Sequence, residues 1–400
     1  MARTAAILGQ APGIGERIGI TAICRSFGRG DIERALQASG RQTYRRRELS
    51  AELTIYFVIA MALLMHVNLR EVLRCLYEGL RSIGSPAAIK VTGKSGISQA
   101  RSRLGSEPLR HLYEGTVVPI ATPRTRGAWY GSWRLVALDG STLNVPDEDA
   151  NRTEFFEPTT FNDHSPFPQI RFVTLTETGT RVLFGAQMAD YRTSEVALAR
   201  QVVRVLKPDM LCIADRGFFG FDMLQRVRAT GAQLLFRARK DSVLPVSQVL
   251  SDGSYLSDVN TWRRGNRGER KPAMTVRVVR YRLDGVEDPD NVYTLVTTLL
   301  DPDAAPAADL AQIYQERWEI ETAFDELKTH LRGARLCLRS KTPELIRQEF
   351  YGLMLAHYAV RMLIHEAALK VDDDPDRISF THSINVIRRK LVALPPSAVG

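Results

Sequence analysis

Two short apolar segments that each run directly into an aspartate constrain the fold more than any other feature. Residues 135–138 (LVAL) lead into Asp139, and residues 211–214 (LCIA) lead into Asp215. Short, continuous apolar segments are typical of buried strands, and open α/β sheets place their sites at the carboxyl ends of such strands. A carboxylate at that edge is costly unless it is paired or holds a metal ion. The pair therefore indicates a functional site, although an aspartate that only begins a turn is the alternative at each position.

The rest of the chain alternates in a way that predicts a layered α/β core. Strands are expected at 169–176, 181–188 and 233–237, with helices at 194–206 and 221–230 between them. Residues 243–250, 274–283 and 291–299 are rich in β-branched side chains, and helices are expected at 308–331 and 342–370. We predict five parts: a helical, basic part (1–125), the first part of the core (126–239), a β-rich insertion (240–300), the second part of the core (301–370) and a tail (371–400).

The helix expected at 308–331 carries a polar stripe beside an apolar one. At about 100° per residue, the polar side chains of the stripe lie within an arc of roughly 60°; they are Tyr314, Arg317, Glu321 and Lys328. Asp325 is the main rival to Glu321 as an inward acid, and the remaining acids, Glu316, Glu319 and Glu326, are expected to be solvated. The alternative is an amphipathic helix with a surface ion pair between Arg317 and Glu321, worth under about 1 kcal/mol.

Carboxylates from two strands and one helix would suit a pair of Mg²⁺ ions. Hard cations prefer oxygen ligands. Two such ions about 3.5–4 Å apart activate a nucleophile and stabilise a leaving oxygen at one phosphorus. Arg317 and Lys328 would then contact the phosphate backbone of a nucleic acid.

The positive charge of the chain lies at one end. The net charge is +9, and residues 1–125 contain 18 Lys and Arg against 9 Asp and Glu, so they hold the whole surplus. The densest basic clusters are residues 41–47 and, around Trp262, residues 263–271. Such clusters attract phosphate, so a nucleic-acid partner is plausible, with a solvated basic surface as the alternative.

Composition excludes several other classes. An apolar fraction of 44% excludes global disorder, and four scattered cysteines exclude a disulfide scaffold and fit a reducing compartment. The longest apolar run, residues 53–65, is too short to cross a membrane and predicts a buried helix. No secretory signal is evident. We therefore expect a cytoplasmic protein without a membrane segment.

The polar stripe and the two aspartates together resemble the DDE transposases of the insertion-sequence-4 family. The family signature is Tyr, two residues, Arg, three residues, Glu, six residues, Lys, and the stripe from Tyr314 to Lys328 matches it without a gap. The two aspartate motifs of the family are met by Asp139-Gly140-Ser141 and by Asp215-Arg216-Gly217-Phe218. Residues 98–101 and 103–105 look like the family's amino-terminal helical domain, and the resemblance covers about residues 20–370.

The resemblance implies an RNase H-like catalytic core with a β-rich insertion and an all-α amino-terminal domain that binds DNA ends. It implies cut-and-paste movement of an insertion sequence by hydrolysis and strand transfer, with two Mg²⁺ ions and Mn²⁺ as a substitute. The metal-binding catalytic residues would be Asp139, Asp215 and Glu321. The residues on DNA phosphates would be Tyr314, Arg317, Lys328 and Arg216.

The implied partners are double-stranded DNA, as terminal inverted repeats and as target, and a second copy of the chain, which together place the protein at the nucleoid. Some relatives flip a base onto an aromatic side chain of the insertion, for which Trp262 is the candidate; a tryptophan that only packs is the alternative. Two other functions stay open: a non-catalytic DNA-binding relic or regulator, and an RNase H-like nuclease that does not join DNA. The intact acids and signature argue against the relic.

Overall fold

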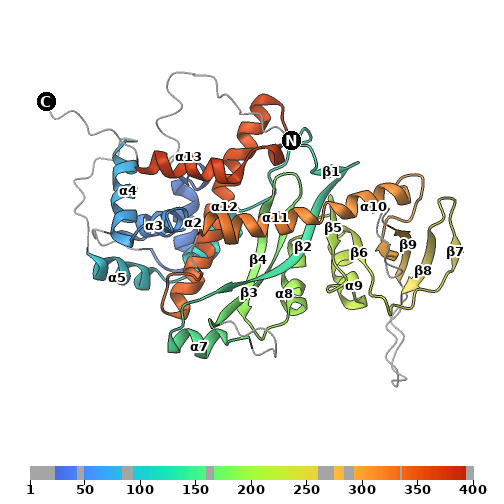
Figure 1. Ribbon diagram of the computed structural model, residues 1–400, viewed down its shortest axis with the longest axis horizontal. Helices are drawn as coiled ribbons and strands as arrows, with labels where there is room; N and C mark the ends of the chain where they lie inside the picture. The colour runs from blue at the N-terminus through green and yellow to red at the C-terminus, as the bar shows by residue number, and fades with distance from the viewer. Residues whose placement is uncertain are drawn as a thin grey trace.

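The computed structural model describes residues 23–42, 49–82, 93–158, 166–259, 274–282, 292–333 and 336–392. A group of helices precedes the sheet and lies at one end of the molecule in Figure 1. These helices are α2 (Arg29–Ala38), α3 (Ala51–Leu63), α4 (Leu69–Ser82), α5 (Lys94–Leu104) and α6 (Glu107–Thr116). Helix α3 begins at Ser50, whose hydroxyl accepts a hydrogen bond from the Leu53 amide, and its residues 54–63 are buried. The predicted buried helix is thus confirmed.

The described strands form one mixed sheet, in the order β4-β3-β2-β5-β6-β10-β9-β8-β7, with β1 beside β2. Its core strands are β2 (Trp133–Asn144), β3 (Gln169–Glu177), β4 (Val182–Asp190), β5 (Met210–Ala214) and β6 (Gln233–Arg237). The remaining strands are β1 (Trp129–Tyr130), β7 (Gln248–Val249), β8 (Tyr255–Val259), β9 (Met274–Arg282) and β10 (Val292–Thr297). Strands β2, β3 and β4 are antiparallel, whereas β5 and β6 run parallel to β2. The mixed α/β class is confirmed.

Alternation along the central strands assigns a helix layer to each face of the sheet. The buried apolar side chains form two clusters. In β5, Leu211 and Ile213 belong to the smaller cluster, which includes Ile313 of α10 (Ala307–Gln315), whereas Cys212 and Ala214 belong to the larger one. The opposite face is covered by α8 (Glu195–Val202), its 3₁₀ extension η1 (Val203–Val205) and α9 (Phe221–Ala229). Because side chains alternate along a strand, Asp139 shares the face of Leu135, which packs with α10.

A long helix, α12 (Pro343–Val371), joins the sheet to the amino-terminal helices and packs against α3, α6 and β4. Gly352 allows a close approach to α3: a Cβ at this position would lie 2.6 Å from Val58 Cγ1 and 3.1 Å from the Val58 carbonyl oxygen. After α12, the short 3₁₀ helix η3 (Pro375–Arg377) leads to α13 (Phe380–Val392).

Replacing Gly352 with valine is expected to destabilise the protein by about 1–3 kcal/mol, because the added methyl groups must push α12 away from α3. Urea unfolding measures the change in the free energy of unfolding. Gly115→Val is the matched control, since nothing lies within 4 Å of a Cβ placed there. Equal stability of the two variants would contradict close packing at Gly352.

The helix predicted at 308–331 is wrong as a single α-helix. It consists of α10, then α11 (Trp318–Asp325), then one stretch of π-helix, η2 (Glu326–Leu331). At the junction the amides of Glu316 and Arg317 bond three residues back, to Ile313 and Tyr314. The tight turns at the junction and the wide turn of η2 shift side-chain directions away from a uniform 100° step.

The insertion also differs from its prediction. Residues 243–250 are mostly irregular, with only β7 in them, and Val243 is 88% exposed. Strand β8 of the insertion was not predicted, and neither was the short helix α7 (Asp149–Phe155), which lies outside the insertion. The described strands of the insertion extend the core sheet, because β10 pairs with β6. The five predicted parts of the chain stay predictions, and Arg45, Arg46, Arg47 and the cluster around Trp262 lie outside the described residues.

Two expectations from composition can be compared with the structure. All four cysteines carry free thiols. Among the helices of the described ranges, none is both long enough and apolar enough to cross a bilayer.

Candidate active site

The two predicted aspartates lie on neighbouring parallel strands, Asp139 within β2 and Asp215 directly after β5. Leu138 of β2 pairs in register with Ala214 of β5, so Asp139 and Asp215 follow at adjacent positions. The carboxylate of Asp139 accepts a hydrogen bond of 2.7 Å from the Gly140 amide, and that of Asp215 accepts one of 3.0 Å from the Gly217 amide. The prediction that the strand ends at the aspartate holds for Asp215, but it is wrong for Asp139, because β2 continues to Asn144 by pairing with β3. Asp139 instead lies where the parallel pairing of β2 with β5 stops.

Arg317 brings one of these strands together with the helix that carries Glu321. Its Nη1 lies 3.7 Å from Asp139 Oδ2, and its Nη2 lies 3.2 Å from Glu321 Oε1. Arg317 is buried at the junction of α10 and α11, and its Nε has no hydrogen-bond partner among the described residues. The Nε–H of Arg317 is therefore buried without an acceptor in the described part of the chain.

The electrostatics of the site favour an added cation. Burial raises the pKa of Asp139 to about 6; the Gly140 amide and Arg317 oppose this, whereas Glu195 and Asp215 add to it. Burial likewise raises the pKa of Tyr314 to about 12, with a further contribution from Asp215. Asp139 is thus a carboxylate that lacks enough positive charge around it to ionise at its ordinary pKa.

The described residues contain no group of three or more His, Cys, Asp or Glu side chains close enough together to hold one metal ion. Asp139 and Glu321 instead meet through the Arg317 guanidinium. The donors nevertheless fit a hard cation in type, since all three side chains offer carboxylate oxygens and the carboxylate of Asp139 has a raised pKa. The role of the three acids as metal ligands stays a prediction.

Lys328 lies close to the strand of Asp139. Its Nζ donates a hydrogen bond of 3.0 Å to the Ser141 hydroxyl, two residues beyond Asp139 on β2 and therefore on the same face. Burial lowers the pKa of Lys328; Arg332 adds to this and Asp325 opposes it. The signature residues Tyr314, Arg317, Glu321 and Lys328 thus all lie on the helical segments of which Arg317 and Lys328 contact the middle of β2, at Asp139 and Ser141.

The other acids of this segment were partly mispredicted. Asp325, the rival to Glu321, is half exposed and its Oδ2 lies 3.1 Å from His330 Nε2. Glu326 was expected to be solvated but is 3% exposed, and Glu319 is largely buried in an ion pair with Arg181. Their partners lie on other elements, so the periodicity of this segment alone gave no signal for their burial.

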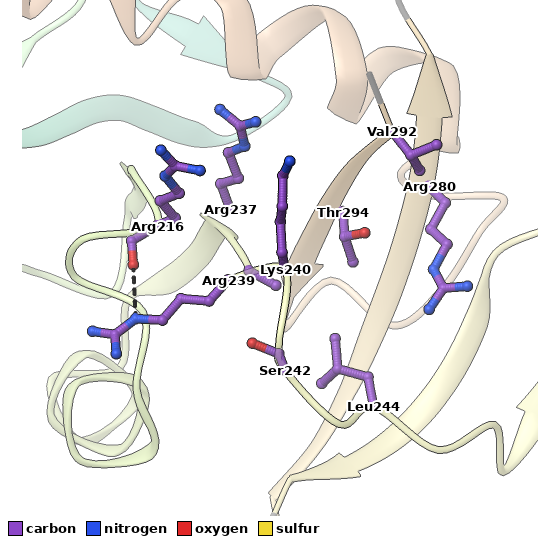
Figure 2. A pocket seen from close by; sticks show the side chains of 10 residues that line it. Arg216, Arg237, Arg239, Lys240, Ser242, Leu244, Arg280, Val292 and Thr294 are labelled. Atoms are coloured by element: carbon purple, nitrogen blue, oxygen red, sulfur yellow. Dashed lines mark hydrogen bonds between the residues drawn. The ribbon is translucent and has the colours of Figure 1, made fainter. Parts of the chain in front are cut away.

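A basic cavity of about 60 Å³ lies beside the loop that follows Asp215 (Figure 2). Its cationic lining residues are Arg216, Arg237, Arg239, Lys240 and Arg280. Arg239 Nε donates a hydrogen bond of 3.3 Å to the Arg216 carbonyl oxygen, which ties the end of β6 to the Asp215 loop. Sequence reasoning found only Arg216, although the cations of residues 237–240 follow a strand as the aspartates do.

Trp318 is another surface feature that sequence reasoning missed. It is 56% exposed, and the Arg317 guanidinium lies 5.2 Å from the centre of its ring. An exposed aromatic ring beside an arginine offers a face on which a base can stack. The earlier candidate, Trp262, lies outside the described residues.

Comparisons with known proteins agree with this arrangement. Residues 132–358 match the family model of the transposase DDE domain, and residues 17–114 match that of the insertion element 4 transposase N-terminal region. The chain therefore belongs to the DDE transposases of the insertion-sequence-4 family. The predicted family and its function, a DNA transposase, are confirmed.

Individual relatives support the same assignment. The transposase InsG for insertion sequence element IS4 of Escherichia coli (strain K12) is 28% identical over 372 residues, which is 92% of this chain and 82% of the relative. The putative transposase InsZ of the same organism is 27% identical over 202 residues, 50% of this chain and 64% of that one.

A solved structure shows the same fold. The piggyBac transposase in a synaptic complex with hairpin DNA matches with a TM-score of 0.50 at 13% identity, over 96% of this chain and 84% of that one. The predicted RNase H-like fold class is confirmed.

Proposed function

We propose that this transposase moves an insertion sequence by cut-and-paste, with Asp139, Asp215 and Glu321 as the ligands of two Mg²⁺ ions, for which Mn²⁺ can substitute. Membership of the DDE family implies dependence on a divalent metal ion. The observation that carries the residue assignment is that Arg317 contacts both Asp139 and Glu321, which come from a strand and a helix remote in the chain. When bound, such ions activate water for attack on phosphorus and stabilise the departing 3′-oxygen.

The remaining signature residues have roles in holding the DNA strand. Arg317, buried and incompletely paired, is suited to a phosphate beside the acids because a guanidinium binds phosphate in a fixed fork. Lys328, held at Ser141, supplies a second cation on the same side. Tyr314 is buried with a raised pKa and keeps its hydroxyl proton for donation to a phosphate oxygen.

The basic cavity extends this surface, and its Arg216 is the predicted phosphate contact in the Asp215 loop. The exposed ring of Trp318 is a second candidate for base stacking, in addition to Trp262. The DNA partners would be the terminal inverted repeats and the target. Two copies of the chain would bind the two ends of the element as a homodimer, and the protein would be associated with the nucleoid.

Purified protein tests this function with a pair of inverted-repeat ends from the element that encodes it, a target plasmid and Mg²⁺. The expected products are ends cut from flanking DNA and then joined to the target. Cleavage without joining would indicate a nuclease. The absence of both reactions with Mg²⁺ and with Mn²⁺ would contradict the proposal.

Replacing Arg237 with glutamine is expected to weaken binding of element-end DNA and to reduce the slope of log K against log[salt] by about 1, because one phosphate contact is lost. Filter binding at several salt concentrations measures the slope. Arg204→Gln is the control, since Arg204 is exposed on η1 and does not line the cavity. Equal slopes for both variants would show that the cavity does not contact DNA.

A further inference from the structure

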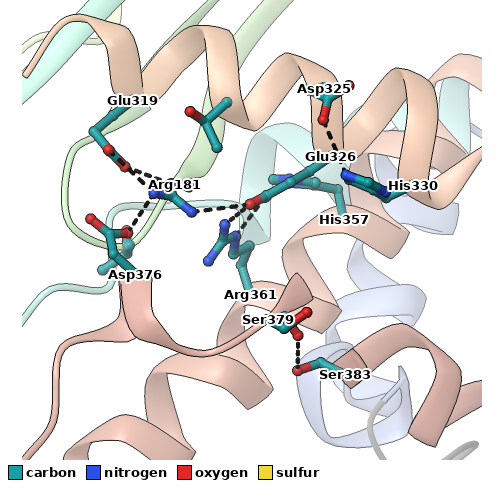
Figure 3. Close-up of polar contacts among 12 residues, drawn as sticks. Arg181, Glu319, Asp325, Glu326, His330, His357, Arg361, Asp376, Ser379 and Ser383 are labelled. Atoms are coloured by element: carbon teal, nitrogen blue, oxygen red, sulfur yellow. Dashed lines mark hydrogen bonds and ion pairs between the residues drawn. The ribbon is translucent and has the colours of Figure 1, made fainter. Parts of the chain in front are cut away.

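A buried network of ion pairs lies behind the helical segment that carries Glu321 and Lys328 (Figure 3). At its centre is Arg181, which closes the turn between β3 and β4 and has a positive φ of 56°. Figure 3 shows its guanidinium pointing toward the carboxylates of Glu319, Glu326 and Asp376.

Arg181 contacts three separate elements. Its Nε and Nη2 bind the Glu319 carboxylate of α11, with Nη2 3.2 Å from Oε1. Its Nη1 lies 3.4 Å from Glu326 Oε1 of η2, and its Nη2 lies 3.2 Å from Asp376 Oδ1 of η3 without hydrogen-bond geometry. The side chain of Arg181 is only 14% exposed. One guanidinium thus joins the edge of the sheet to both halves of the helical segment.

The positions of its partners relate this network to the proposed site. Glu319 precedes Glu321 by two residues, and Glu326 precedes Lys328 by two residues. On the α-helix α11, residues two apart point about 200° apart, so Glu319 and Glu321 lie on opposite sides. For Glu326 and Lys328 on η2 the contacts show the same division, since Glu326 meets Arg181 and Lys328 meets Ser141. Arg181 therefore holds the back of the segment, while Glu321 meets Arg317 and Lys328 meets Ser141 on the front.

Glu326 has further partners that do not depend on Arg181. Arg361 Nε of α12 donates a hydrogen bond of 2.7 Å to Glu326 Oε2, and His357 Nε2 lies 3.3 Å from the same oxygen. The end of η2 is also tied down, because Arg388 Nη2 donates a hydrogen bond of 2.8 Å to the Leu331 carbonyl oxygen. Loss of Arg181 would consequently release Glu319 and loosen the segment at α11, while Glu326 keeps Arg361 and His357 as partners.

We propose that Arg181 is a positioning residue for the transposition reaction, which fixes the distance of Glu321 and Lys328 from Asp139 by clamping the back of their helical segment to the sheet. This role rests on the proposed function of Glu321 and Lys328. Arg181 itself touches none of the proposed metal ligands. A displacement of about 1 Å in a reacting group costs on the order of 10²-fold in rate, so a clamp of this kind is needed for accurate placement.

Hydrogen exchange of the full-length, metal-free protein tests the clamp without any catalytic readout. In Arg181→Met, which keeps the apolar stem but removes the charge, amides of residues 318–331 are expected to exchange at least about 10-fold faster than in the wild type, with α3 and β5 unchanged. Arg181→Lys is expected to lie in between, since lysine keeps the charge but cannot bind two carboxylates in a fork. Arg110→Met is the matched control, because Arg110 pairs with two glutamates within α6.

Cleavage of element-end DNA tests the consequence for the reaction. Arg181→Met is expected to cut about 10²-fold more slowly and to need more Mg²⁺ for half-maximal rate, with unchanged end binding. Glu319→Gln, which leaves Arg181 paired with Glu326, is expected to change exchange and rate in the same direction by less, and it serves if Arg181→Met does not fold.

Three results would overturn this role. The first is unchanged exchange in residues 318–331, and the second is faster exchange throughout the chain, which would mean a general loss of stability. The third is local loosening with wild-type cleavage and Mg²⁺ dependence, which would leave the proposed function intact. A wild-type protein that does not cleave would overturn the proposed function and this role together.

Discussion

Replacing Asp215 with asparagine is expected to lower the rate of element-end cleavage by more than about 10³-fold, because the change removes the charge of a proposed metal ligand, and bound metal ions supply several kcal/mol of barrier reduction in such reactions. The amide keeps the shape of the side chain and can still accept the hydrogen bond from the Gly217 amide. Binding of element-end DNA is expected to remain, since the proposed contacts with the phosphates are made by arginine and lysine side chains rather than by the metal ions. A single-turnover cleavage assay with labelled ends and a gel-shift assay measure the two quantities.

Asp325→Asn is the matched control for this loss. Asp325 lies on the same helical segment as Glu321, but it is half exposed and pairs with His330. It is expected to cleave at the wild-type rate. If cleavage required Asp325 but not Asp215, the proposal that Asp139, Asp215 and Glu321 are the metal ligands would be contradicted.

Replacing Glu326 with leucine is expected to destabilise the protein by about 3–5 kcal/mol, because Arg361 is left as a buried charge without its main partner. Arg361 is fully buried and Glu326 is 3% exposed. Burial raises the pKa of Glu326, but Arg361 and His357 together hold it below its ordinary value, so the pair is ionised. Urea unfolding of the full chain measures the loss.

Two further variants identify the cause. Glu114→Gln removes a surface partner of Arg110 and is expected to cost less than about 1 kcal/mol. The double change Glu326→Leu with Arg361→Met is expected to recover much of the stability, because replacement of a whole buried pair by apolar groups is often neutral. A double variant less stable than Glu326→Leu alone would show that the isolated charge is not the cause.

Much of the fold could be predicted from the sequence, because the strands and helices are marked by the order of apolar and polar residues within short segments. The apolar runs before Asp139 and Asp215 are buried strands, and the alternation between faces of the sheet follows directly from them. The junction at Arg317 could not be predicted, since the step from tight turns to π-helix is set by packing on the sheet and α12 rather than by propensity.

The residues of the candidate site also fall into those that the sequence predicted and those that it did not. The signature spacing located the residues of the front stripe, which the structure places around Arg317 and Ser141. Glu326 was misplaced because its burial depends on Arg361 and Arg181, which lie far away in the chain. The basic cavity was missed for a related reason, since its wall combines the end of β6 with β9 and β10.

The most direct test of the central claim is anomalous diffraction from crystals of the protein with cut element-end DNA and Mn²⁺. We expect two anomalous peaks about 3.5–4 Å apart, with carboxylate oxygens of Asp139, Asp215 and Glu321 as their protein ligands. Peaks held by other acids, or three ordered carboxylates with no peak between them, would contradict the account.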